Sequence, residues 1–386
     1  MHASSSALGI TVGVVQFFFA TTWTLYVIYL PQLAQAAGIG KQWVPWILVA
    51  DQVIFAVVDV ATGFWIDRVR SGVARLGGWI LGLTVISSLA FLALPYFNLS
   101  PTVLLAAIAV WAVTSSALRS PPWAMLGRHA AQPRLPALAA LVLIGSAIAS
   151  AIAPYLGLTL RGVDPRLPFV VSTLTLLASV AALVYAERRA AAPQAPQEAA
   201  PRQAGSPLAL YAALLVMAVG FQVHFSLNSA PRYLQHAAPT QLAYLMPVFW
   251  IGFSFAMPVS SALVKRLGAL EGMAIAAGIG ALAMYCATLA SSLGALIACE
   301  ALAGASWGLA CVGAYSAATG FGRTGREGRF LGTLFATFAI AAFARIAAYA
   351  SDLVVEPSLK AVLPWVPVLA WVAAALLLVV PTSRSR

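Results

Sequence analysis

The chain alternates long apolar runs with short polar connections. Each run holds about 20 to 25 residues and few charges, the length at which an α-helix crosses the hydrocarbon core of a bilayer. The runs predict twelve membrane spans, at 8–31, 43–66, 76–97, 101–122, 136–160, 167–186, 207–229, 241–264, 270–292, 294–318, 329–351 and 360–381. Because this number is even, both termini are expected on the same side of the membrane. The predicted fold class is an all-α membrane protein.

The composition excludes an ordinary soluble protein. Hydrophobic residues make up 61% of the 386 residues and charged residues 9%, whereas soluble domains carry roughly 25% charged residues. The three cysteines lie in apolar runs at spacings that match no metal site, which is typical of small buried residues. We expect neither a metal nor a cofactor.

The basic residues predict the orientation. Of the 22 Lys and Arg residues, 15 lie in the even-numbered connections and the C-terminal tail, 5 in the odd-numbered connections, and 2 inside predicted spans. Basic residues concentrate on the cytoplasmic side of membrane proteins. Both termini are therefore predicted in the cytoplasm, with the chain in the inner (cytoplasmic) membrane. The net charge of +11 reflects this topology, and such scattered loops are not expected to bind nucleic acid.

An internal repeat divides the chain in two. The segment 59–70 has a counterpart at 257–267, which starts 198 residues further on. Residues 187–206 are rich in Ala, Pro and Gln, a composition typical of flexible linkers. We predict a six-helix bundle at 1–186, a cytoplasmic linker at 187–206 and a second six-helix bundle at 207–386. Two parallel halves of this kind are typical of one large class of transporters.

A short motif stands in the connection after the second predicted span. It reads Gly63-x-x-x-Asp67-Arg68 and resembles the signature of the major facilitator superfamily, whose members fold as two six-helix bundles. The resemblance implies that Gly63 lets two helices approach closely. It also implies that Asp67 and Arg68 form a latch on the cytoplasmic side.

Three further segments carry a narrower resemblance. They are Asp59 four residues before the glycine, the segment 119–126 with its Trp123, and the loop Thr324–Gly328. Together they resemble the glycoside–pentoside–hexuronide:cation symporters, the melibiose permease group. The resemblance implies a sugar substrate that stacks on Trp123, and coupling to a cation. Arg119 stands where that group has an acid, and this difference favours proton over sodium coupling.

Six ionisable side chains lie inside predicted spans: Asp51, Asp59, Arg119, His224, Glu300 and Arg345. Counted at 1.5 Å per helical residue, they form two layers. We expect Asp59 with Arg119 in the cytoplasmic layer, and Glu300 with Arg345, His224 and Asp51 in the outer layer. A charge at the centre of a spanning helix costs about 2.5–3.5 kcal/mol on insertion scales, so each needs a partner or a function. Static pairs and pairs that open during transport both fit the sequence.

The transport hypothesis gives these residues roles. Asp59 stays ionised beside Arg119 until an anionic substrate draws Arg119 away, and Asp59 then binds a proton. Glu300 and Asp51 are further candidates for proton coupling. The substrate-binding candidates are Arg119, Trp123, Gln16, Trp23, His224, Asn228 and Arg345. Gln16 and His224 are equally explained as groups that bond to a neighbouring helix, and Trp123 as an anchor at the membrane interface.

The sequence thus predicts a secondary active transporter that works by alternating access. It would move a sugar, sugar acid or carboxylate, coupled to protons. The alternatives are an exporter of amphipathic drugs or lipid-like compounds, and a membrane scaffold without transport. The string Gly304-x-Ser306-x-Gly308 matches a serine nucleophile elbow, but small residues at this spacing in an apolar span usually pack helices. We predict that the chain is not an enzyme, and that a monomer suffices because the cavity of this fold lies within one chain.

Overall fold

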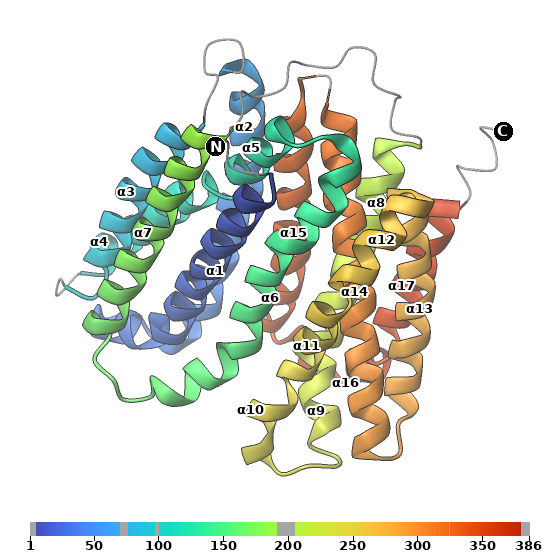
Figure 1. The fold of residues 1–386 in the computed structure, drawn as a ribbon. Helices are drawn as coiled ribbons and strands as arrows, with labels where there is room; N and C mark the ends of the chain where they lie inside the picture. The colour runs from blue at the N-terminus through green and yellow to red at the C-terminus, as the bar shows by residue number, and fades with distance from the viewer. Residues whose placement is uncertain (1–4, 70–75, 97–99, 191–204, 324, 380–386) are drawn as a thin grey trace.

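The structure, a computed structural model, describes residues 5–69, 76–96, 100–190, 205–323 and 325–379. Every regular element in these ranges is helical. The first half of the chain forms α1 (Ser5–Ala36), α2 (Val44–Val69), α3 (Gly77–Ala93), α4 (Pro101–Ser116), α5 (Pro121–His129), α6 (Leu135–Thr159) and α7 (Arg166–Arg189). Most of these helices, blue to green in Figure 1, stand side by side in one group.

The second half of the chain forms the other group, yellow to red in Figure 1. Its helices are α8 (Pro207–Val223), the π-helix η3 (His224–Asn228), α9 (Ser229–Tyr233), α10 (Leu242–Leu245), α11 (Pro247–Phe255), α12 (Met257–Leu267), α13 (Ala269–Leu289), α14 (Leu293–Gly322), α15 (Glu327–Ala350), α16 (Pro357–Val362) and α17 (Val366–Val379). Single 3-10 turns, η1 (Lys41–Trp43), η2 (Gln132–Arg134), η4 (Pro239–Gln241) and η5 (Leu353–Val355), lie in the connections.

The spanning helices agree with the predicted runs in type and order. Among the described residues, nine helices are long and apolar enough to cross a membrane, and a bent pair makes a tenth. The other two runs contain α3, of 17 residues, and α17, of 14 residues. At 1.5 Å per residue these helices reach about 26 Å and about 21 Å, less than the hydrocarbon core of about 30 Å. The fold is thus all-helical and membrane-spanning, while the count of twelve spans remains a prediction.

Prolines explain where predicted spans are broken. Pro121 begins α5 after a short turn that follows α4, and Pro247 begins α11. Pro258 is the second residue of α12, and α12 is bent by 42° from the helical segment before it. Proline has no backbone N–H and clashes with the preceding turn, so a helix breaks or kinks there.

Glu187 corrects the predicted start of the linker. Its carboxylate is buried and accepts hydrogen bonds from the backbone N–H groups of Leu76 (2.9 Å) and Gly77 (2.8 Å), where α3 begins. A carboxylate at a helix N-terminus satisfies free N–H groups and interacts favourably with the helix dipole. Helix α7 continues to Arg189, so Glu187 belongs to the first helix group and not to the linker. Residues 191–204 of the predicted linker lie outside the described residues, as does Thr324.

The two helix groups meet along two pairs of surfaces. Helix α2 packs along α15, and α6 packs against α11, α12 and α14. The contact of α2 with α15 is between backbones: a Cβ atom added to Gly63 would collide with the carbonyl of Gly328, and one added to Gly332 would collide with the carbonyl of Asp59. Small residues allow such close approach in membrane proteins.

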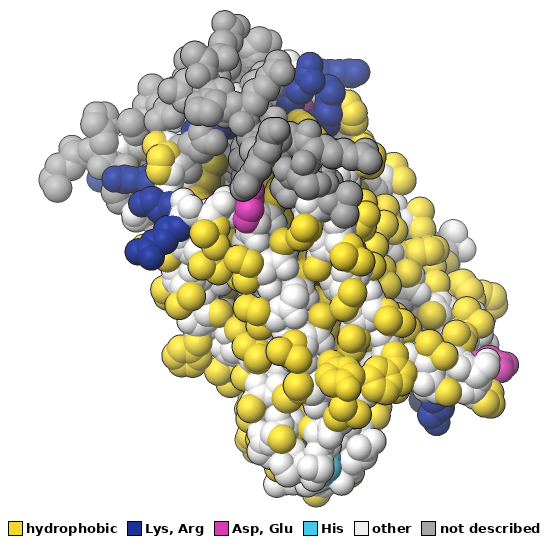
Figure 2. Space-filling view, turned by 90° about the vertical axis from the view of Figure 1, so that its right-hand side faces the viewer, with side chains coloured by type: hydrophobic (Ala, Val, Ile, Leu, Met, Phe, Trp, Pro, Cys, Tyr) yellow, Lys and Arg dark blue, Asp and Glu magenta, His cyan; other side chains and the backbone are white. Residues whose placement is uncertain are grey.

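Charge distinguishes the two ends of the bundle. Basic side chains lie where α5, α7 and α12 end, namely Arg128, Arg188, Arg189, Lys265 and Arg266. We call this the basic end and the other the far end. In Figure 2 most of the visible Lys and Arg side chains gather toward the top, and hydrophobic side chains cover much of the face below. Exposed side chains such as those of Phe255 and Leu208 belong to this apolar outer surface, as expected where helices face lipid.

We expect Gly63→Ala to lower the melting temperature of the detergent-purified protein. Its new methyl group would collide with the backbone of α15, and overpacking of this kind costs roughly 1–3 kcal/mol. Gly82→Ala in α3 is the matched control, because its Cβ would meet no atom within 4 Å. Equal melting temperatures for the two variants would contradict a tight contact between α2 and α15.

Candidate functional site

A cavity of about 400 Å³ lies between the two helix groups. Its polar lining includes Gln16 and Gln52 from the first group, Gln222 from the second, and one arginine from each, Arg119 and Arg345. Its aromatic lining comprises Phe19, Trp23, Phe55, Trp111, Tyr315, Phe335 and Phe338. This combination of a few polar groups in an aromatic wall is typical of sites for small molecules.

A larger hollow of about 740 Å³ lies elsewhere, along α2, α3 and the turn after α4. Its lining is almost wholly apolar and includes the exposed side chains of Trp79 and Ile86. Among the described residues, no charged side chain lines it. The smaller cavity is therefore the better candidate for binding a polar solute.

Arg119 connects the cavity to a buried acid. It lies in the turn between α4 and α5, and its Nη1 donates to Asp59 Oδ2 at 2.9 Å. Asp59 is fully buried and also accepts a hydrogen bond from Ser116 Oγ (3.0 Å). The Arg119 guanidinium lies 5.3 Å from the ring centroid of Phe55 and 5.0 Å from that of Phe335, both of which line the cavity. The expected juxtaposition of Asp59 and Arg119 is confirmed.

Arg345 lies in the same cavity, and the expectation that it joins Glu300 is wrong. It projects from α15 into the cavity lining. It forms no hydrogen bond or ion pair with any residue that the structure describes, and its Nε is buried without a partner. The depths of the two residues along their helices are similar, but their side chains leave those helices toward different neighbours. Arg345 is thus a cation in the cavity that no described residue neutralises.

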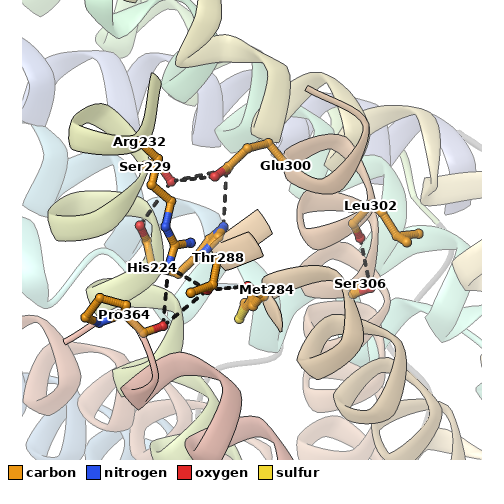
Figure 3. Close-up of polar contacts among 9 residues, drawn as sticks. All are labelled: His224, Ser229, Arg232, Met284, Thr288, Glu300, Leu302, Ser306 and Pro364. Carbon is orange, nitrogen blue, oxygen red and sulfur yellow. Dashed lines mark hydrogen bonds and ion pairs between the residues drawn. The ribbon is translucent and has the colours of Figure 1, made fainter. Parts of the chain in front are cut away.

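Glu300 forms a separate cluster in the second helix group (Figure 3). One of its oxygens lies 3.2 Å from His224 Nε2, and Ser229 Oγ lies 3.0 and 3.1 Å from its two oxygens. Nearby, Arg232 Nη2 donates to Thr288 Oγ1 (2.6 Å) and to the carbonyl of Pro364 (3.3 Å). The sequence reasoning overlooked Ser229 and treated Arg232 as a loop residue, although it is buried.

Two predicted substrate-binding residues do not reach the cavity. His224 is fully buried beside Glu300, and Asn228 donates to the carbonyl of Leu363 at 3.0 Å. Asp51 is also placed differently from the prediction. It lies in the other helix group from Glu300 and accepts a hydrogen bond from Tyr26 Oη at 2.8 Å. None of these residues lines the cavity.

Of the two tryptophans predicted to bind substrate, one lines the cavity and the other does not. Trp23 lines the cavity, stacked against Trp111 with ring centroids 5.9 Å apart. Trp123 does not line it: the indole is 5% exposed and stacks on the ring of Tyr315 with centroids 3.9 Å apart. Tyr315 lines the cavity itself. Trp123 therefore lies behind the cavity wall, where it cannot stack on a solute in this arrangement.

Ser306 is bonded within its own helix. Its hydroxyl donates to the carbonyl of Leu302 one turn earlier, at 2.9 Å. The neighbouring Gly304 faces the backbone of Phe249 so closely that a side chain would collide with it. The glycines of the string that matches a nucleophile elbow thus lie where α14 packs against α11.

The basic end is closed by contacts between the two helix groups. Asp67 Oδ1 accepts from the backbone N–H of Gly328 (2.8 Å), and Oδ2 accepts from that of Arg329 (3.0 Å). The α2 carboxylate thereby caps the N-terminus of α15. Arg323 Nη2 adds a bond to the carbonyl of Ala130 at 3.1 Å. Arg68 is exposed and has no hydrogen-bond or ion-pair partner among the described residues.

Comparisons with known proteins agree with this architecture. The family profile described as Major Facilitator Superfamily matches residues 12–344. A search of curated proteins found no match.

Three solved structures show how widely the fold is shared. A bacterial homologue of the iron transporter ferroportin, in its outward-facing state, has a TM-score of 0.74 at 15% identity and covers 98% of this chain and 100% of its own. The human organic anion transporter MFSD10 (TETRAN) has a TM-score of 0.69 at 15% identity, covering 98% of both chains. FucP, the E. coli fucose:proton symporter, in its outward conformation, has a TM-score of 0.69 at 13% identity, also covering 98% of both. At these identities the likeness concerns the fold.

We expect Asp67→Ala to loosen the closed basic end, since it removes both bonds to the start of α15. The readout is the alkylation rate of Thr319→Cys, a buried site beside Gly127 of the other group, in a chain whose three native cysteines are replaced by alanine. Losing a helix cap costs about 0.5–2 kcal/mol, so labelling should accelerate several-fold. Arg68→Ala is the control and should leave the rate unchanged. Equal rates for both variants would show that Asp67 does not hold the two groups together.

Proposed function

The chain belongs to the Major Facilitator Superfamily, and from this premise we propose that it is a secondary active transporter of a small organic anion. It is a transporter of this superfamily and not an enzyme. In the proposal, the substrate binds in the 400 Å³ cavity between the helix groups. The two groups then rock around the bound substrate and expose it to each side in turn.

The observation that carries the anion proposal is the charge of the cavity wall. Arg119 and Arg345 both line it, while Asp59 stands behind Arg119 as its partner. Arg345 is left without a neutralising group among the described residues. Charged residues inside a membrane protein usually pair with each other or mark a substrate pathway. A carboxylate on the substrate would supply the missing partner.

Three side-chain amides favour a solute with hydroxyl groups. Gln16, Gln52 and Gln222 line the cavity, and their side chains make no hydrogen bond to any described residue. An amide that no protein group satisfies can bond to a ligand that supplies donors and acceptors. Sugar acids and hydroxylated carboxylates fit this wall better than drugs or lipids do, which makes the exporter of amphipathic compounds the weaker alternative. A scaffold without transport would have no use for the uncompensated Arg345.

The structural neighbours are chemically diverse: a homologue of an iron transporter, an organic anion transporter and a fucose:proton symporter. Among the described residues no group of three or more His, Cys, Asp or Glu side chains is placed to hold a metal ion. A wall whose charged groups are guanidinium groups favours an anion over an iron cation. The proposed substrate has the same sign of charge as that of the organic anion transporter among these neighbours.

We propose further that a proton drives this transport. Arg119 is shared between Asp59 and the cavity. A substrate carboxylate that engaged Arg119 would weaken its bond to Asp59, and the buried Asp59 carboxylate would then bind a proton and become neutral. The coupling of substrate to proton would thus be an exchange of partners at one guanidinium.

The membrane arrangement completes the proposal. Helices α3 and α17 would also cross the bilayer, which gives twelve spans in two bundles joined by the segment after Arg189. Both termini and the basic end would lie in the cytoplasm, with the protein in the inner membrane, as the distribution of basic residues favours. The cavity lies within one chain, so a monomer is sufficient.

A thermal-shift experiment tests the anion proposal. A sugar acid should raise the melting temperature of the purified protein, since a ligand that binds the folded state stabilises it, whereas the neutral parent sugar should not. Arg345→Gln should weaken this binding at least about tenfold, which corresponds to roughly 1.4 kcal/mol. Arg189→Gln, an exposed arginine outside the cavity, is the control for loss of charge. A shift that the neutral sugar produces equally well would contradict the proposal.

Uptake into proteoliposomes tests the coupling. Asp59→Asn should abolish accumulation driven by a pH gradient but preserve exchange of substrate across the membrane, because the amide cannot take up the proton. Asp51→Asn is the matched control, since Asp51 is equally buried but bonds to Tyr26 and does not reach Arg119. If Asp59→Asn still accumulates substrate against its gradient, Asp59 is not the coupling group.

A further inference from the structure

A second buried acid, Glu300, lies outside the cavity and contacts side chains from η3 and α9. We call Glu300, His224 and Ser229 the Glu300 cluster (Figure 3). Glu300 comes from α14, His224 begins the π-helix η3, and Ser229 is the first residue of α9. All three are at most 1% exposed. The carboxylate contacts both partners within 3.2 Å.

The charge of this cluster depends on a proton, which distinguishes it from the pair of Asp59 and Arg119. A guanidinium is always protonated in proteins, so Arg119 balances Asp59 at any physiological pH. Among the described residues, the basic group within ion-pair distance of Glu300 is His224, and an imidazole, unlike a guanidinium, exists in a charged and a neutral form. One proton therefore changes the net charge of the Glu300 cluster by one unit.

None of the other charged or titratable groups described around the cluster forms an ion pair with Glu300. Arg232 on α9 interacts with Glu300 electrostatically, but its Nη2 donates to Thr288 and Pro364. Tyr233, Cys299 and, more remotely, Cys286 are the other titratable neighbours. Phenol and thiol groups ordinarily titrate well above neutral pH. Glu300 and His224 therefore form the direct acid–base contact of the cluster, with 3.2 Å between the carboxylate oxygen and Nε2.

The carboxylate also bridges the two ends of the π-helix. It contacts His224, the first residue of η3, and Ser229, the residue after its end. Ser229 Oγ additionally lies 3.0 Å from the carbonyl of His224. Short π-helical turns inside α-helices are frequent at functional sites. A protonated carboxyl group gains a donor and loses acceptor capacity, so these bonds must rearrange when the cluster takes up a proton.

The π-helix connects the cluster to the cavity. Gln222, two residues before η3, lines the cavity wall. At the other end of η3, Asn228 is anchored to the carbonyl of Leu363, just before α17. A change in the winding of η3 would thus move Gln222 relative to a bound solute.

From these observations we propose that the Glu300 cluster is a second proton-binding site, in which the Glu300 carboxylate takes up the proton beside His224, and that its occupancy is transmitted to the cavity through η3. This deepens the proposed function, because it rests on transport that a pH gradient drives. Proton binding itself needs no organic substrate. A test without substrate therefore separates failure of this inference from failure of the proposed function.

Infrared difference spectroscopy of the purified full-length protein provides that test. A shift from about pH 7.5 to about pH 5.5, on either side of the imidazole range, should produce a carbonyl band of protonated carboxylic acid. Glu300→Gln should remove one component of this band. Glu271→Gln, the same substitution at an exposed glutamate in the first turn of α13, should remove none. If Glu300→Gln folds and its spectrum equals that of the wild type, the proposal is overturned.

Two further variants address the cluster as a unit. His224→Gln keeps a hydrogen-bond donor beside the carboxylate but cannot take up a proton, so the pH at which the component develops should shift by about one unit or more. An unchanged pH would show that the two groups do not share the site. If Glu300→Gln does not fold, Ser229→Ala provides the test. Losing the hydrogen bond from Ser229 to Glu300 should change the frequency of the carbonyl band component that we assign to Glu300. A frequency equal to that of the wild type would then refute the assignment.

Discussion

The close approach of α2 and α15 is the contact on which the rest of the structure depends. Because Gly63, Gly328 and Gly332 have no side chains, the two backbones touch directly. This contact brings Phe335 of α15 against the guanidinium of Arg119, and the start of α15 within reach of Asp67. The wall of the cavity and the closure of the basic end are therefore parts of one interface. Any movement that opens the basic end must separate these glycines and break the bonds to Asp67.

Lipid offers no partner for a charge, so the protein must handle each intramembrane charge by itself. It does so in three ways. Asp59 is balanced by a permanent cation, Arg119. Glu300 is held by a histidine and a serine, neither of which is a permanent cation. Arg345 faces the cavity with no protein partner in the described part of the chain. The three arrangements, with a permanent cation, with a histidine and with no partner, are the basis for proposing a carrier that binds a proton and an anion.

The comparisons separate fold from substrate. A homologue of an iron transporter, an organic anion transporter and a fucose:proton symporter share this architecture over nearly its whole length at 13–16% identity. A fold that accommodates such different solutes cannot specify any one of them. Specificity must come from the few side chains that line the cavity. In this chain those include Arg119, Arg345 and three glutamines.

The sequence by itself determined the helical class, the order of the helices, the glycine motif and the pairing of Asp59 with Arg119. Length, hydropathy and spacing are properties of the chain, and depth follows from counting residues along a helix. Only the tertiary structure decided which way each side chain faces. Arg345 and Glu300 share a depth, yet the first faces the cavity and the second faces η3. Trp123 likewise turns toward Tyr315, and Glu187 toward α3. The rotation of a helix about its axis is set by the neighbours it packs against, and an apolar span with lipid on one side and protein on the other carries too little periodic contrast to reveal that rotation.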